Sequence, residues 1–126
     1  MSYHLGGWTE KQGEVLATNL LENESPLPTA ILVGSDPMAI GVYRALKQKN
    51  IQIGEEIVVA SFDNIETIAN LSPGLTSVQI NAKSIGQAAV RMALERIDGI
   101  RDEPIILTYP ARLIVRESFI PRTKRY

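Results

Sequence analysis

The chain has 126 residues, of which 44% are hydrophobic, with 13 basic against 14 acidic residues and a net charge of -1. These values favour one packed domain and exclude a disordered chain, a broadly basic nucleic-acid binder and, in the absence of cysteine, any disulfide or thiolate site. No apolar run is long enough to span a bilayer and no signal sequence opens the chain, so we expect a cytoplasmic protein.

The first predicted element is a helix from Thr9 to about Asn23. Thr9 and Gln12 fit a capping box, in which each side chain accepts a hydrogen bond from the other residue's backbone N–H. Leucines at positions 16, 20 and 21 follow at helical spacing. The pattern therefore predicts an amphipathic helix.

The next two elements are a strand over residues 29–34 and a helix that ends near Asn50. The apolar run of the strand is continuous, which predicts burial on both faces, as in a parallel sheet. Asp36 before Pro37 is a helix start with Asp36 as the cap, although Ser35 could cap instead and leave Asp36 free. Asn50 predicts a left-handed stop.

The remaining elements continue this alternation. The sequence predicts strands at residues 57–62, 75–80, 105–109 and 112–115, a short helix or loop at 65–71 and a helix at 82–97. Such an order implies βαβ units, and hence an α/β fold with an open, parallel, Rossmann-like sheet and helices on both faces. The chain opens directly into a helix, as though the first units were missing.

Motifs for catalysis and cofactor binding are absent from the sequence. It contains no G-x-G-x-x-G loop, no Walker A loop and no G-x-S-x-G nucleophile elbow. His4 is the only histidine, so a histidine metal cluster is impossible. We therefore expect no enzymatic activity, no cofactor and no metal.

Polar residues follow two predicted strands, at the sheet edge where parallel α/β folds bind ligands. Ser35-Asp36 follows the first strand and Asp63-Asn64 the second. With Trp8 they would suit a polyhydroxylated ligand, because the ring covers the apolar face of a sugar while the acids accept its hydroxyl hydrogens. Other interpretations stay open, namely a cap for Asp36, turn chemistry for residues 63–64 and a hydrophobic staple for Trp8.

Several segments, spread over nearly the whole chain, carry the motifs of one family. Residues 28–41 are PTAILVGSDPMAIG, residues 53–64 are IGEEIVVASFDN, and residues 109–118 are YPARLIVRES. In order and spacing these segments, with LTSV at 75–78 and Trp8 before Gly13, resemble the LacI/GalR family of bacterial transcription regulators.

The resemblance implies a DNA-binding helix-turn-helix followed by a two-lobed core of the periplasmic-binding-protein-like I fold, with an effector between the lobes. Residues 1–126 match only the later part of that core, as a single fragment of the second lobe in which about 82–108 cross into the first lobe. The fragment would sense an effector, most simply a sugar, for a repressor, and would not itself bind operator DNA. The alternative is a sugar-binding transport protein of the same fold.

The family's ligand positions transfer to this sequence residue by residue. Asp63 matches the acid that binds effector hydroxyls, and Trp8 matches the aromatic ring that stacks on the effector. Ser35 stands where many members have a ligand-contacting asparagine, and Asp36 matches the residue after it. The resemblance therefore implies an effector site at these four residues.

The resemblance also implies a homodimer formed partly through the second lobe. The positions that match its surface are Ile40, Tyr43, Arg44 and, near the turn at Pro73, Leu71.

Overall fold

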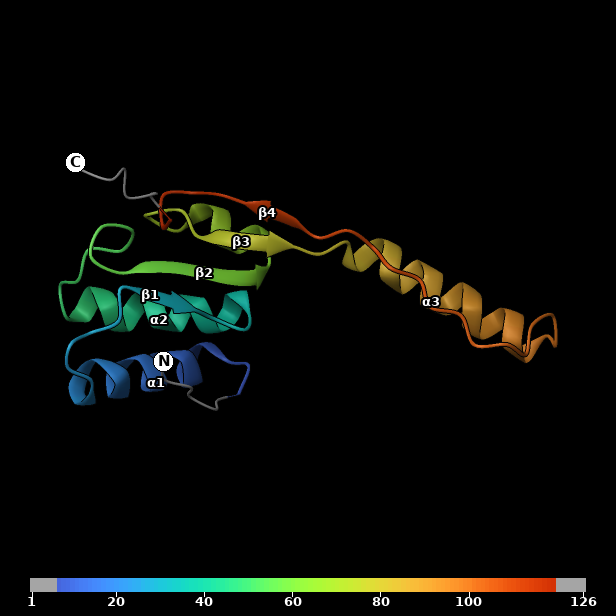
Figure 1. Cartoon of the computed structure of the whole chain (residues 1–126), viewed down its shortest axis with the longest axis horizontal. Helices are drawn as coiled ribbons and strands as arrows, with labels where there is room; N and C mark the ends of the chain where they lie inside the picture. The colour runs from blue at the N-terminus through green and yellow to red at the C-terminus, as the bar shows by residue number, and fades with distance from the viewer. Residues whose placement is uncertain (1–6, 120–126) are drawn as a thin grey trace. The chain divides into compact units, whose positions relative to one another are not determined.

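The computed structural model describes residues 7–119, which form two compact units, residues 7–79 with 113–119 and residues 80–112. The first unit is a sheet with helices layered against it (Figure 1). Its elements are α1 (Glu10–Asn23), β1 (Ala30–Leu32), α2 (Asp36–Gln48), β2 (Val58–Asp63), the 3₁₀ helix η1 (Glu66–Asn70), β3 (Thr76–Gln79) and most of β4 (Arg112–Ile114). The second unit contains α3 (Ala82–Ile97). None of the described helices is long and apolar enough to cross a membrane.

The four strands lie in the order β1-β2-β3-β4. The first two pairings, β1 with β2 and β2 with β3, are parallel, with Leu32 opposite Ala60 in β1 and β2. After β4 the chain passes β3 in the opposite direction, because Arg116 N donates to Thr76 Oγ1 at 2.8 Å while Ser118 N donates to Gly74 O at 2.9 Å. The α/β class is confirmed, and the sheet is mixed rather than purely parallel.

The ends of α1 and α2 show how local chemistry fixes these helices. Thr9 caps α1 with both hydrogen bonds of the predicted box to Gln12. In α2 the cap is Ser35, whose side chain makes no capping bond, and Asp36 is the first helical residue. The prediction of Asp36 as the cap is therefore wrong. Asn50 has φ of 57°, which confirms the left-handed stop.

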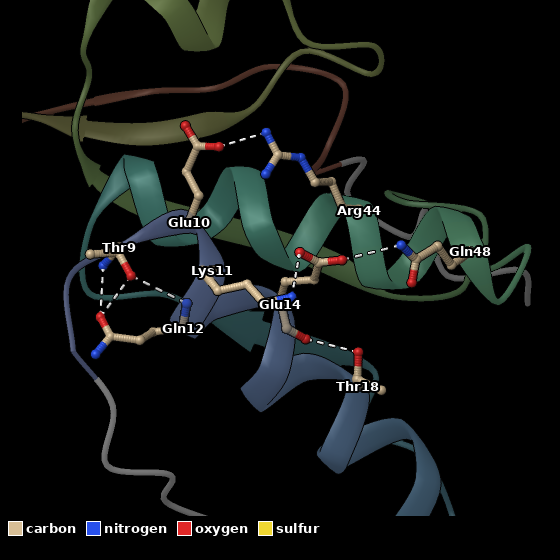
Figure 2. A network of polar contacts seen from close by, with 8 residues as sticks. All are labelled: Thr9, Glu10, Lys11, Gln12, Glu14, Thr18, Arg44 and Gln48. Carbon is tan, nitrogen blue, oxygen red and sulfur yellow. Dashed lines mark hydrogen bonds and ion pairs between the residues drawn. The ribbon is translucent and has the colours of Figure 1, made fainter.

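Two glycines allow α1 and α2 to approach closely. A Cβ atom on Gly13 would lie 2.1 Å from Met38 O, and one on Gly41 would lie 1.9 Å from Glu10 O. Polar pairs at the rim also join the helices, for example Gln48 Nε2 donating to Glu14 Oε1 at 3.2 Å (Figure 2). Because these rim pairs are exposed, the close backbone packing contributes more to stability than they do.

Two predictions about strands are wrong. The first is that the strand over residues 29–34 is buried on both faces. Ile31 packs on the core, but its neighbour Leu32 is 70% exposed, because it points to a face of the sheet that the described elements leave open. Residues 105–109 are not a strand. A strand needs a hydrogen-bonding neighbour, and no described strand pairs with this segment, where Ile106 is 93% exposed. The helix at 82–97 is confirmed with its predicted bounds.

Tyr43 of α2 lies in the core and is 2% exposed. Its Oη atom has no hydrogen-bond partner of good geometry among the described residues. Burial raises the pKa of Tyr43 from 10.0 to about 12, although the nearby Ser118 hydroxyl opposes the shift. The neutral phenol is therefore the form that the folded chain tolerates.

The raised pKa of Tyr43 predicts a loss of stability at alkaline pH. Between pH 10 and 12 the unfolded chain releases a proton that the folded chain keeps, so rising pH favours unfolding. Tyr43→Phe should remove a fall of about 1 kcal/mol per pH unit in this range and leave stability at neutral pH nearly unchanged. Urea unfolding of the unaltered chain and of Tyr43→Phe across this pH range measures the difference. If the free energy of unfolding falls equally with pH in the two chains, the prediction is contradicted.

Candidate functional site

Asp36 lies fully buried at the carboxyl edge of the sheet, as the hub of a hydrogen-bond network. Its Oδ1 atom accepts hydrogen bonds from the hydroxyls of Ser61 and Ser77, the latter at 2.8 Å. Its Oδ2 atom accepts from Ile65 N at 2.7 Å. Both oxygens are thus used by the fold, and the observed contacts of this carboxylate are structural ones.

Asp63 and Asn64, at the end of β2, have an unusual backbone. Their φ angles are 104° and 55°, a left-handed region that costs energy for residues other than glycine. Asn64 Oδ1 accepts a 2.8 Å hydrogen bond from Arg116 Nη2. In the part of the chain that the structure describes, the Asp63 carboxylate has no hydrogen bond or ion pair. The fold holds this turn in place while leaving its carboxylate available.

Ser35 and Trp8 lie at the end of the neighbouring strand. Ser35 is 5% exposed, and its Oγ atom has no hydrogen-bond partner within residues 7–119. The Trp8 ring lies over Gly34, where an added Cβ would meet Trp8 Cζ3 at 3.8 Å, and it is 72% exposed. A staple would pack Trp8 on the fourth residue of α1, but that residue is Gly13, which has no side chain.

The four predicted site residues therefore lie at one edge of the sheet, but they differ in availability. Among the described residues, the Asp63 carboxylate and the Ser35 hydroxyl have no hydrogen-bond partner and the Trp8 ring is exposed, whereas Asp36 is enclosed. The arrangement places hydrogen-bond acceptors beside an exposed aromatic ring. A sugar fits both, because its hydroxyls donate hydrogen bonds and one face of its ring is apolar. Nowhere in residues 7–119 do three potential metal ligands cluster.

Sequence reasoning missed the residues that support the site. Ser61 and Ser77 occupy inward positions on β2 and β3, and both are fully buried. Buried serines in otherwise apolar strands signal a polar partner, since a buried hydroxyl needs one. Arg116 arrives from after β4, so only the tertiary fold brings it to Asn64.

The four predicted dimer positions differ in how much of each side chain is exposed. Ile40 and Leu71 are half-buried, and Arg44 is exposed and paired with Glu10. Tyr43 belongs to the core, which corrects its prediction as a surface residue. Leu71 lines a wide hollow at the amino ends of β2 and β3, at the opposite end of these strands from the candidate site.

Fold and site together define a binding module of the periplasmic-binding-protein class. The model of the periplasmic binding protein-like domain matches residues 2–119. The HTH-type transcriptional repressor PurR of Glaesserella parasuis serovar 5 is 32% identical over 115 residues, which are 86% of this chain and 34% of the relative. This chain thus spans about a third of the length of that relative.

Two solved structures have the same fold. A lac repressor dimer bound to operator and the anti-inducer ONPF superimposes with a TM-score of 0.82 at 30% identity, over 91% of this chain and 40% of that one. A complex of the transcriptional regulator CelR with cellobiose gives a TM-score of 0.86 at 28% identity, over 94% and 37%. The chain belongs to the LacI/GalR family and corresponds to part of its effector-binding core.

Proposed function

We propose that this chain is the effector-sensing part of a LacI/GalR-type transcriptional repressor and that its effector is a sugar. The observation that carries the proposal is the Asp63 carboxylate, which has no hydrogen bond or ion pair within residues 7–119 and is held on a left-handed turn at the carboxyl edge of the parallel strands, where α/β sheets bind ligands. A carboxylate accepts charge-assisted hydrogen bonds from sugar hydroxyls. The exposed ring of Trp8 would cover the apolar face of the same sugar.

The relatives support this assignment over that of a transport protein. The similar proteins are repressors and regulators, one of them in complex with cellobiose and another as a dimer on operator DNA. By this likeness the protein acts in the cytoplasm, is not an enzyme, and forms a homodimer. Operator binding would belong to a helix-turn-helix outside these residues, and the effector would act by its differential affinity for two arrangements of the core.

The second unit, residues 80–112, would connect this part of the core to the first lobe. Residues 80–112 leave the sheet after β3 and return into β4, as a crossover into a first lobe would. Several apolar side chains of this unit are exposed, among them Val90 at 62% and Ile97 at 78%. A first lobe would cover such side chains and gain the free energy of their burial.

A fluorescence titration tests the proposed effector site. Trp8 is the sole tryptophan, so its emission reports directly on the site. We expect a saturable change with one sugar from a panel of sugars, sugar phosphates and nucleobases. Asp63→Asn should weaken that affinity about tenfold or more, because it removes a charged hydrogen-bond acceptor.

Asp102→Asn is the matched control, since it removes a carboxylate in the second unit, remote in sequence from the site residues. It should leave the affinity unchanged. Saturation by a nucleobase instead of a sugar, or equal losses in the two variants, would contradict the proposal, as would the absence of any saturable change.

A further inference from the structure

The turn that carries Asp63 is strained, yet its conformation is well determined by its neighbours. Two successive residues other than glycine have positive φ, at Asp63 and Asn64. Such backbone persists only where surrounding contacts fix it, and it occurs preferentially at functional sites. The contacts that fix this turn are therefore part of how the site works.

Ser77 of β3 makes the central contact. Its hydroxyl accepts a hydrogen bond from Asn64 N at 3.1 Å and donates one to Asp36 Oδ1 at 2.8 Å. Ile65 N donates to the other oxygen of Asp36 at 2.7 Å. Two successive backbone N–H groups after Asp63 are thus tied, one through a hydroxyl and one directly, to a single buried carboxylate.

Arg116 holds the same turn through a side chain. Its Nη2 atom donates to Asn64 Oδ1 at 2.8 Å, and its Nη1 atom donates to Leu75 O at 2.6 Å. Because the guanidinium is planar and rigid, the second bond orients the first. Asn64 is therefore held at both its backbone and its side chain, while the adjacent Asp63 carboxylate has no hydrogen bond or ion pair within residues 7–119.

We propose that Ser77 and Arg116 are positioning residues, which set the direction of the Asp63 carboxylate and thereby the affinity for the effector without contacting it. This inference rests on the proposed function of Asp63 as the effector-binding acid. A carboxylate on a fixed turn loses less conformational freedom on binding than one on a mobile loop, so binding is tighter. Loosening the turn should weaken binding even when every effector-contacting group is intact.

A pair of serine variants isolates the positioning role. Ser61 and Ser77 are both fully buried, and both donate to Asp36 Oδ1, but only Ser77 contacts the turn. Each substitution removes one hydrogen bond to Asp36, and Ser77→Ala also removes the acceptor of the Asn64 N–H, so it should lower the free energy of unfolding somewhat more than Ser61→Ala. Ser77→Ala alone should accelerate hydrogen exchange of the Asn64 amide about tenfold, normalised to the Val59 amide in the core, because that N–H loses its acceptor.

The affinity for a bound sugar gives the second measurement on the same chains. Ser77→Ala should weaken it about tenfold and Ser61→Ala less than twofold. Equal exchange rates at Asn64 in the two variants would overturn the inference, whether or not a sugar binds. Faster exchange in Ser77→Ala with no sugar bound by the unaltered chain would instead support the positioning of the turn and refute the proposed function.

Discussion

Gly41→Ala is expected to lower the free energy of unfolding by about 3 kcal/mol or more, enough to unfold a chain of marginal stability. The added methyl would lie 1.9 Å from Glu10 O and 2.6 Å from Glu14 N. Both atoms are backbone of α1, so neither can turn aside as the end of a side chain could. Relief requires α1 to move away from α2, which also separates Gly13 from Met38. Urea unfolding followed by circular dichroism measures the loss.

Gly86→Ala is the matched control, because Gly86 is also a helical glycine but nothing lies within 4 Å of its added Cβ. Alanine should stabilise α3 by about 0.5 to 1 kcal/mol through its higher helix propensity. Opposite signs for the two variants are thus expected from the same chemical change. A Gly41→Ala chain as stable as the unaltered one would show that the two helices do not pack as closely as described.

Asp36→Ala should cost about 3 kcal/mol or more of stability, since it leaves the buried donors of Ser61, Ser77 and Ile65 without an acceptor. The substitution also leaves a void where the fully buried side chain stood. We expect loss of cooperative unfolding or a large shift of the urea midpoint. A shift no larger than that of an ordinary surface variant would contradict the hub role of Asp36.

The nearby carboxylate of Asp63 should behave in the opposite way. Asp63→Gly relieves the φ of 104° and removes no hydrogen bond within the described residues, so the chain should gain about 1 kcal/mol. The same variant should abolish the effector-dependent change in Trp8 fluorescence. The two variants would thereby distinguish an acid that supports the fold, Asp36, from the acid proposed to bind the effector, Asp63.

Local chemistry predicted the helices well. The capping box of Thr9 and Gln12, the stop at Asn50 and the helix from Ala82 to Ile97 all depend on contacts between residues near in sequence. The strand predicted at residues 105–109 is wrong because strand formation depends on residues far apart in the sequence. A β-branched and apolar run becomes a strand only where another strand accepts its hydrogen bonds. The exposed side chain of Leu32 likewise shows that an apolar run can predict a strand without predicting which face of that strand other elements cover.

The position of the candidate site could be predicted from the sequence, but which of its acids supports the fold and which is available to a ligand could not. The rule that ligands bind at the carboxyl ends of parallel strands placed Ser35 and Asp63 correctly along the sheet. It could not tell the enclosed Asp36 from the free Asp63, since both are acids that follow a strand. That difference arises from Ser77, far along the sequence, whose hydroxyl reaches Asp36 only in the folded chain.

The placement of residues 80–112 between two paired strands has a consequence for the architecture of the first unit. The hydrogen bonds from Arg116 N to Thr76 Oγ1 and from Ser118 N to Gly74 O show that the chain after β4 runs antiparallel to β3, and β3 and β4 are neighbours in the sheet. A two-residue Asn-Gly turn is the shortest connection between such strands. The excursion is therefore an insertion into a β-hairpin, and a chain with residues 81–111 replaced by that turn would retain the whole network around Asp36 as a minimal scaffold.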